Sequence, residues 1–359
     1  MSALPQAASI PAAPPEVREI WYTRCPVPTA SGLAQHFRWV HAAFAREGIA
    51  VHSLRDSDDP AVRESHFTHS LPASFREGGN IPAIWARSGG QDTVVVGITW
   101  VDEEQLILVA PDSDIRTLAD IRGRRLGIPK NTARVVDFPR AQDLHGLVTG
   151  VRLAGLQPED VQIVDIAGHD FQQRRIGAAG PGSIHQATAD ALLAGTVDVI
   201  YAKGAAGAWL VQERGLRPLL DINAHPDPFV RVNTGTPRPV TVNRDLAEQR
   251  PDIVARYLAT LLRAAHWARS HPDEVTAAVA AETGTTADNV RRGYGPGLHQ
   301  HFDVLLSDQY VEGLRRQTAF LREWGFLQGD FDYDAWIARE PLALAHQIVA
   351  REGPALPSA

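Results

Sequence analysis

Apolar positions along the chain follow two periods, one typical of strands and the other of helices. Segment 93–101 is strongly β-branched, as expected for a buried strand. Within 32–47 the apolar side chains recur three or four residues apart, at Leu33, Phe37, Val40 and Phe44. Beyond residue 245 nearly every apolar pattern has the helical period. The pattern therefore predicts strands alternating with helices, followed by a helical C-terminal region.

Turn residues divide this pattern into separate elements. Strands are predicted at 19–23, 49–54, 93–101, 105–110, 161–166, 197–202, 219–222 and 239–243. Helices are predicted at 32–47, 80–87, 137–156, 184–194, from 202 to about 214, and at 251–269, 271–282 and 307–324. Segment 118–128 predicts a helical turn, a glycine turn and a strand. Segment 1–16 is predicted to be a flexible tail, and 168–183 either a lid or an ordinary surface loop.

Alternating strands and helices indicate an α/β fold with mostly parallel sheets. Two such blocks predict two lobes, with 17–112 and 228–359 in the first lobe and 113–227 in the second. Ligands of open α/β sheets bind beyond the carboxyl ends of the strands. Cys25 lies two residues beyond the first predicted strand, and is therefore predicted to lie at such an end.

Composition narrows the classes of function. The chain has 359 residues with 35 basic and 42 acidic side chains, and its net charge of −7 argues against nucleic acid or an anionic membrane as a partner. No run approaches 18 apolar residues, so no membrane span is expected. Residues 1–15 contain no Lys or Arg and do not resemble a secretory signal, which predicts a cytoplasmic protein.

Cys25 is the only cysteine in the chain and stands in Tyr-Thr-Arg-Cys-Pro-Val-Pro at 22–28. The two prolines stiffen the backbone and remove two N–H donors, so the thiol is expected on a rigid loop. Cys25 is then either a small buried hydrophobic residue or a reactive thiol, and the sequence around it has to decide.

Segment 65–82 has the character of an anion site. Gly78 and Gly79 allow the backbone to approach a ligand closely, and Asn80 is predicted to cap the helix that follows. A helix N-terminus favours an anion, and Arg76 adds a planar pair of donors. A sulfinate, sulfonate or carboxylate fits these groups, although a surface arginine beside a helix cap is an equally simple interpretation.

His66 and His69 are three residues apart. That spacing allows a metal site with Cys25 as third ligand, but no nearby carboxylate or fourth ligand supports it. Either histidine can also be an ordinary surface or core residue. The third interpretation pairs one imidazole with the thiol, where it tunes or orients the thiol proton.

Together these segments resemble the 2′-hydroxybiphenyl-2-sulfinate desulfinase family, which acts in the last step of dibenzothiophene desulfurisation. The resemblance is strongest at 22–30 and from His66 through Arg76, Gly78 and Gly79 to Pro82, and extends weakly over about 19–340. It implies a two-lobed fold of the type II periplasmic-binding-protein kind, with Cys25 and His66 as catalytic residues. Arg76 and the Gly79 N–H would hold the sulfinate, and neither a metal nor an organic cofactor is implied.

The sequence differs from this family around the implied pocket. Segment 202–207 is Ala-Lys-Gly-Ala-Ala-Gly where the family carries bulky aromatic residues, and Gln142 stands in place of a tryptophan. Lys203 is expected to add a positive charge and Tyr201 to line the substrate site. A second anion-contacting helix start is predicted at Asn131 and Thr132, on the opposite lobe. A pocket of different shape is the consequence.

The predicted function is hydrolytic desulfination of an aryl or related sulfinate, which releases sulfite. Cys25 acts either as a nucleophile on sulfur or as the proton donor to the carbon that bears it. The alternative is a solute-binding protein for sulfonate-, nitrate- or taurine-like anions that feeds a transporter. A cytoplasmic ligand sensor is a third possibility. The sequence does not indicate the oligomeric state.

Overall fold

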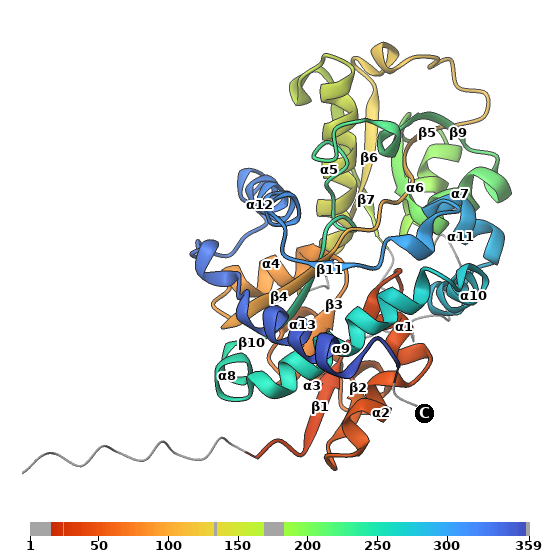
Figure 1. The fold of residues 1–359 in the computed structure, drawn as a ribbon. Helices are drawn as coiled ribbons and strands as arrows, with labels where there is room; N and C mark the ends of the chain where they lie inside the picture. The colour runs from red at the N-terminus through yellow and green to blue at the C-terminus, as the bar shows by residue number, and fades with distance from the viewer. Residues whose placement is uncertain (1–15, 24, 133–134, 169–182, 357–359) are drawn as a thin grey trace, which may run out of the picture.

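The computed structural model describes residues 16–23, 25–132, 135–168 and 183–356. Two lobes lie one above the other in Figure 1, the upper drawn mainly in yellow and green and the lower mainly in red, orange and blue. This is the predicted α/β architecture with a helical C-terminal region. The expectation of mostly parallel sheets is wrong, because five of the eight strand pairings among the described residues are antiparallel. Residues 1–15 of the expected tail and 169–182 of the expected lid or loop lie outside the described residues.

The lower lobe is built on a six-stranded mixed sheet. Its order is β11 (Val304–Leu305), β4 (Thr93–Thr99), β10 (Arg238–Asn243), β3 (Ser74–Glu77), β1 (Glu19–Tyr22) and β2 (Ala50–Ser53). β1 pairs in parallel with both β2 and β3, whereas β10 runs antiparallel to β3 and β4. The carboxyl ends of β1 and β3 therefore meet at one edge of this sheet.

The upper lobe contains two smaller sheets. One has the order β8 (Ile200–Lys203), β5 (Gln105–Val109) and β9 (Arg217–Asp221), and the other pairs β6 (Arg125–Lys130) with β7 (Gln162–Ala167). β5 was expected in the first lobe, which was predicted to extend to residue 112. Because β5 pairs with β8 and β9, it belongs to the upper lobe, and the boundary lies before Gln105.

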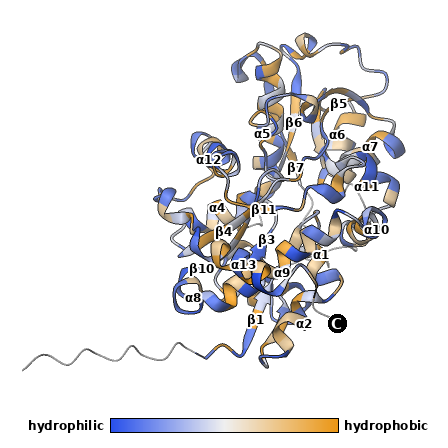
Figure 2. Ribbon diagram, viewed as in Figure 1, coloured by the Kyte–Doolittle hydropathy of each residue, from blue (hydrophilic) through white to orange (hydrophobic). Residues whose placement is uncertain are grey.

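Helices cover the sheets and join the two lobes. They are α1 (Ala30–His36), α2 (Trp39–Ala45), α3 (Pro60–Thr68), α4 (Asn80–Ser88), α5 (Phe138–Leu153), α6 (Gln186–Leu193), α7 (Gly204–Arg214), α8 (Arg244–Gln249), α9 (Pro251–Ala268), α10 (Pro272–Thr283), α11 (Ala287–Tyr294), α12 (Asp308–Glu323) and α13 (Glu340–Glu352). Figure 2 shows that hydrophobic residues gather on the inner strands and on the helix faces turned toward them.

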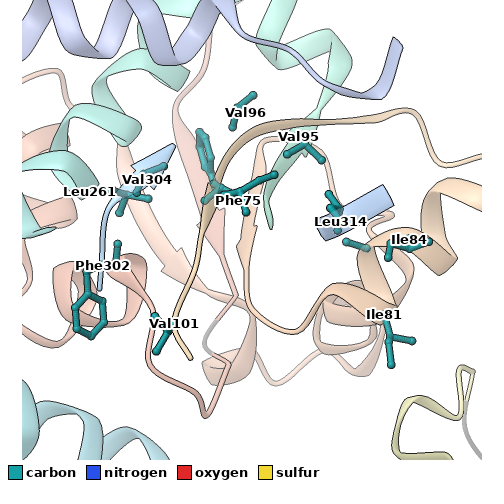
Figure 3. Packing of buried hydrophobic residues seen from close by; sticks show 14 of the residues in the cluster. Phe75, Ile81, Ile84, Val95, Val96, Val101, Leu261, Phe302, Val304 and Leu314 are labelled. Carbon is teal, nitrogen blue, oxygen red and sulfur yellow. The ribbon is translucent and has the colours of Figure 1, made fainter. Parts of the chain in front are cut away.

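The main core lies between the lower sheet and its helices. Phe75 of β3 stacks on Tyr257 of α9 with ring centroids 3.9 Å apart. Figure 3 shows Phe75 among Val95 and Val96 of β4 and Leu261 of α9. This packing fixes β3, the strand of the sheet that carries Arg76, against α9.

The C-terminal helices contact both lobes. The ring of Phe320 in α12 stacks on His145 of α5 with centroids 3.8 Å apart. Gly293 of α11 packs so closely on Gly204 and Ala205 of α7 that a Cβ there would lie 2.3 Å from their backbone. Segment 228–359, assigned by sequence to the first lobe alone, thus also supports the upper one.

Three local features differ from the predicted pattern. The helix expected at 32–47 is broken into α1 and α2, because Arg38 adopts a left-handed conformation with φ of 60°. Helix α3 and strand β3 were not predicted at all. No helix among the described residues has the length and apolar character needed to cross a membrane.

Candidate active site

Cys25 and Arg76 are brought together by the parallel pairing of β1 and β3. Tyr22 lies beside Phe75 in the register, and the Thr23 N–H donates to the Phe75 carbonyl at 2.9 Å. Cys25 follows β1 directly, whereas Arg76 is the third residue of β3. The shared edge of the sheet therefore brings together the two residues that the sequence placed 51 positions apart.

The loop that carries Cys25 is anchored at its far end by α1. The Thr29 hydroxyl caps this helix by accepting from the Gly32 N–H at 2.9 Å. Glu77 of β3 accepts from the Ser31 N–H at 2.7 Å and from the Thr99 hydroxyl at 2.9 Å. Burial raises the pKa of Glu77, although these hydrogen bonds and the charge of Arg238 act in the opposite direction.

Gly78 is the point of closest approach between the Cys25 loop and β3. A Cβ at Gly78 would lie 2.8 Å from both Cβ and Sγ of Cys25, which is closer than real Cβ contacts. The same position is 3.8 Å from Nη2 of Arg76. A glycine is therefore required at this position, and the half-buried thiol lies beside the guanidinium across it.

Arg76 is a buried cation whose guanidinium has N–H donors without an acceptor among the described residues. Its side chain is 2% exposed, and its Nε donates to the backbone carbonyl of His66 at 3.2 Å. Its Nη1 is buried and has no hydrogen-bond partner in the part of the chain that the structure describes. Burial lowers the pKa of Arg76 to about 10, while the charge of Cys25 raises it. The guanidinium is therefore charged near neutral pH and available to an anion.

His66 and His69 lie on the other side of Arg76, in and directly after the last turn of α3. Burial, and then the charge of Arg76, lower the pKa of His66 to about 3 and hold the pKa of His69 well below its ordinary value. Both rings are consequently neutral near pH 7 and supply no charge to a thiolate. The backbone carbonyl of His66, rather than its ring, binds Arg76.

The start of α4 differs in detail from the prediction. Gly79, not Asn80, is the N-cap residue, and Asn80 is the first residue of the helix. The N–H of Asn80 donates to the Thr234 carbonyl at 2.8 Å. Within the described part of the chain, no hydrogen bond uses the N–H of Gly79. The free amide at this helix start is thus that of Gly79, beside Gly78 and Cys25.

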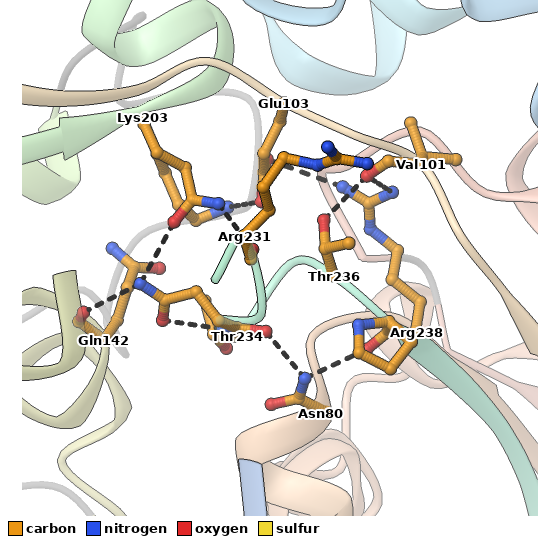
Figure 4. Close-up of polar contacts among 12 residues, drawn as sticks. Asn80, Val101, Glu103, Gln142, Lys203, Arg231, Thr234, Thr236 and Arg238 are labelled. Carbon is orange, nitrogen blue, oxygen red and sulfur yellow. Dashed lines mark hydrogen bonds and ion pairs between the residues drawn. The ribbon is translucent and has the colours of Figure 1, made fainter. Parts of the chain in front are cut away.

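Three residues predicted to bind substrate lie in a buried hydrogen-bond network between the lobes, drawn in part in Figure 4. The Asn80 side chain donates to the carbonyls of Asn233 and Pro237, at 2.8 and 2.9 Å. The Asn233 side chain donates to the Gln142 carbonyl at 3.2 Å and to the Tyr201 hydroxyl at 3.1 Å. Asn80, Gln142 and Tyr201 therefore connect α4 to the upper lobe.

Lys203 is neutralised within the protein. Its Nζ lies 2.7 Å from Glu103, which also pairs with Nη2 of Arg238 at 3.5 Å (Figure 4). Glu103 is 1% exposed and Arg238 is fully buried. The sequence analysis missed both, although an acidic residue between two buried strands is itself an unusual signal.

Tyr294 of α11 connects this ion cluster to the candidate site. Burial, and then the charge of Glu103, raise the pKa of Tyr294, and the charge of Cys25 adds to the same effect. A Cβ on Gly204 would lie 2.9 Å from its hydroxyl and 3.2 Å from Glu103. Glu103 of the ion cluster and Cys25 thus both act on the pKa of Tyr294.

Thr132 is not at a helix start. It is exposed, and α5 begins at Phe138 with Asp137 as N-cap. Asp137 accepts from the N–H and the side chain of Asn131, at 2.7 and 2.8 Å. The predicted second anion site at Asn131 and Thr132 is therefore wrong, since a carboxylate already occupies that helix end.

The metal alternative finds no support in the geometry. Across the described ranges, no group of three or more His, Cys, Asp or Glu side chains is arranged to hold a metal ion. His66 binds Arg76 through its backbone carbonyl, and Cys25 approaches the guanidinium across Gly78.

Comparisons with known proteins find a matching family model and a relative that is similar over most of the chain. A family model described as NMT1/THI5 like matches residues 44–275. The 2′-hydroxybiphenyl-2-sulfinate desulfinase of Rhodococcus erythropolis is 29% identical over 358 residues, which cover 89% of this chain and 91% of the relative.

Two solved structures match this chain over most of its length. A cysteine-to-serine mutant of the enzyme DSZB in complex with biphenyl-2-sulfinic acid matches with a TM-score of 0.73 and 27% identity, covering 92% of this chain and 99% of the other. The periplasmic aliphatic sulphonate binding protein SsuA of Escherichia coli matches with a TM-score of 0.62 and 18% identity, covering 90% and 93%. The second likeness concerns the fold alone.

Proposed function

From the premise that the chain belongs to the NMT1/THI5-like family, we propose that it is a hydrolytic desulfinase of aryl sulfinates. The balanced reaction converts an aryl sulfinate and water into the sulfur-free arene and hydrogen sulfite. The observation that carries the proposal is the position of the Cys25 thiol beside the charged, buried Arg76 guanidinium, with Gly78 between them. The similarity to a named desulfinase over nearly the whole chain supports the same reaction.

In this proposal Nη2 of Arg76 and the N–H of Gly79 hold the sulfinate oxygens. Cys25 then follows one of two routes. As a nucleophile it attacks sulfur, the C–S bond breaks, the thiol proton goes to the ring carbon, and water cleaves the covalent sulfur adduct to thiol and sulfite. As an acid it protonates the ring carbon, and the departing sulfur dioxide takes up water while its proton returns to the thiol.

His66 is proposed to act as a neutral ring in either route. With its pKa lowered to about 3, it can accept the thiol proton or orient it, but it holds no resting charge near pH 7. The positive charge available to the bound anion is therefore that of Arg76. In this respect the site differs from a thiolate–imidazolium pair.

A panel assay tests the proposal against the solute-binding alternative. Purified protein is incubated with aryl sulfinates that include biphenyl-2-sulfinic acid, and released sulfite is quantified. The same compounds and matching sulfonates are titrated by calorimetry. We expect sulfite release from at least one aryl sulfinate, and binding without turnover for sulfonates. Binding without sulfite from any sulfinate would leave a carrier as the better account.

A further inference from the structure

A small polar cavity lies against Arg76. Its lining includes Ser65, His69, Ser74, Arg76, Thr241 and Asn243, and its volume is about 10 Å³. A cavity of this size accommodates about one water molecule, provided that it offers two to four polar partners.

Three residues that line this cavity each have a buried polar atom with no hydrogen-bond partner among the described residues. The atoms are Nη1 of Arg76, Nε2 of His69 and the hydroxyl of Thr241. The exposed fractions are 2% for Arg76, 6% for His69 and 1% for Thr241, so these groups do not form hydrogen bonds with bulk water. Buried polar groups in native proteins are satisfied by protein or by ordered water. Three such atoms around one cavity therefore define a hydrogen-bonding site.

The backbone directs these side chains to the same place. Thr241 lies directly opposite Arg76 in the antiparallel pair of β3 and β10, so the two side chains share one face of the sheet. His69 ends α3 in the left-handed conformation, with φ of 56°. Few residues other than glycine adopt this conformation. The structure around His69 therefore holds the residue in place.

We propose that this cavity holds one ordered water that connects Arg76, His69 and Thr241, and that His69 is thereby a positioning residue for the sulfinate-binding guanidinium. The water accepts from Nη1 of Arg76 and exchanges hydrogen bonds with His69 and Thr241. Because Nε is already held by the His66 carbonyl, the water fixes the second edge of the guanidinium. The plane of Arg76 then presents Nη2 toward Gly78 and Cys25.

The role of the water rests on the proposed function, in which Arg76 holds a sulfinate. The water is expected to fix the orientation of the Arg76 guanidinium without changing its charge. Removing the polar tip of His69 leaves Arg76 charged but free to turn about its last bonds, which weakens planar recognition of a two-oxygen anion. The loss is therefore expected in binding before it appears in the chemical step.

Kinetics of three variants test the positioning role. His69→Phe is expected to raise KM for the sulfinate about ten-fold with kcat changed less than three-fold, because a guanidinium that can turn no longer directs Nη2 at the anion. Thr241→Val is expected to give a smaller rise, and His69→Gln to restore KM to within three-fold of wild type, since its amide still reaches the water. Thr260→Val, a buried threonine of α9 far from the cavity, is the matched control. A merely structural role would lower kcat through loss of folded protein, with KM unchanged, and that pattern would overturn the proposal.

A crystal structure of the ligand-free protein tests the water itself. The expected result is a single peak within 3.2 Å of the three unpaired atoms, with no anomalous signal after bromide exchange. An unfilled cavity or a halide at that position would contradict the inference.

Calorimetric binding of biphenyl-2-sulfinic acid separates this proposal from the proposed function. If wild-type protein binds the sulfinate but releases no sulfite, the desulfinase assignment fails, while a ten-fold weaker affinity in His69→Phe still supports the positioning role. Equal affinity in wild type and His69→Phe refutes that role, whatever the assay for sulfite shows.

Discussion

Among single residues, Arg76 combines burial with charge in a way that suits an anion. Its guanidinium is 2% exposed, is held at Nε by a carbonyl, and has the thiol for a neighbour rather than a carboxylate. A buried cation without a carboxylate beside it carries an unbalanced field. In the proposed function a bound sulfinate supplies a negative charge beside this guanidinium.

Arg76→Lys is predicted to keep the charge and lose the function. An ammonium group cannot hold the His66 carbonyl and at the same time direct a donor at the sulfinate from one rigid plane, so kcat/KM for sulfite release should fall about 10- to 100-fold. Steady-state kinetics with a titrated sulfite assay measures this. Arg63→Lys, on the exposed face of α3, is the control and should match wild type. Equal kinetics for both variants would show that planar recognition plays no part.

At the scale of elements, the pairing of β1 with β3 explains why the site lies where it does. The rule that ligands bind beyond strand ends correctly placed Cys25 at a strand end, from sequence alone. The pattern of apolar positions did not predict β3, the strand that pairs with β1. Ser74–Glu77 has a single apolar side chain, although all four of its residues are buried. Its polar residues serve neighbouring groups instead: Glu77 binds α1 and β4, and Arg76 faces the thiol.

Other elements carried signals that the sequence analysis did not use. Asp59 followed by Pro60 is a helix start, in which the carboxylate accepts from the Ala61 N–H at 2.8 Å and the proline occupies the first turn. This pair predicts α3, the helix that carries His66. By contrast, nothing local indicates that Asn80 would turn from capping α4 to binding Asn233, since that partner is 153 residues away.

Gly78→Ala is predicted to displace the Cys25 loop from β3. The added Cβ would lie 2.8 Å from two atoms of Cys25, so the thiol has to move while the fold is retained. A shift of about 1 Å at a reacting group costs on the order of 100-fold in rate, and we expect a loss of that size in kcat. Gly297→Ala is the control, because its Cβ would meet only a ring atom at 3.8 Å. Thermal melts would confirm that both variants fold, and full activity in Gly78→Ala would show that the contact is dispensable.

On the scale of the whole molecule, the lobes are joined by buried polar groups. Glu103 follows β4 and pairs with Lys203 at the end of β8 and with Arg238 at the start of β10. The fold class and the two lobes were predictable from the alternation of strands and helices. The ion cluster was not, because its members lie 100 and 135 residues from Glu103 and only the folded chain brings them together.

Glu103→Gln is predicted to destabilise the protein strongly. The substitution leaves two cations buried without their carboxylate, a change that typically costs about 3–5 kcal/mol in the free energy of unfolding. Urea denaturation measures it. Adding Lys203→Met to Glu103→Gln should recover part of the loss, because one of the stranded charges is then removed. A single variant as stable as wild type would mean that the cluster is solvated and does not connect the lobes.

Acid stability is a second property of the whole molecule. His66 and His145 each have a folded-state pKa lowered to about 3 by burial, below the ordinary 6.5. Between these values the unfolded chain binds the proton and the folded chain does not. Stability therefore falls as pH drops from 6.5 toward 3, by up to about 1.4 kcal/mol per pH unit for each histidine.

His145→Gln isolates this effect away from the site, because His145 stacks on Phe320 between α5 and α12. The difference in slope between wild type and variant cancels the contributions of all other groups. Denaturation at pH 6.5, 5.5 and 4.5 should show a slope shallower by about 1.4 kcal/mol per pH unit in the variant at the acid end. Equal slopes for wild type and His145→Gln would show that His145 is not the group that takes up the proton on unfolding.

The most direct test of the account is sulfite release by Cys25→Ser with biphenyl-2-sulfinic acid or the best substrate of the panel. An alcohol is a far weaker acid and nucleophile than a thiol, so turnover should fall by at least about 1000-fold. Because Arg76 and Gly79 are untouched, the calorimetric affinity for the sulfinate should stay within three-fold of wild type. A variant that binds equally well and retains most of its sulfite release would contradict both routes through the thiol.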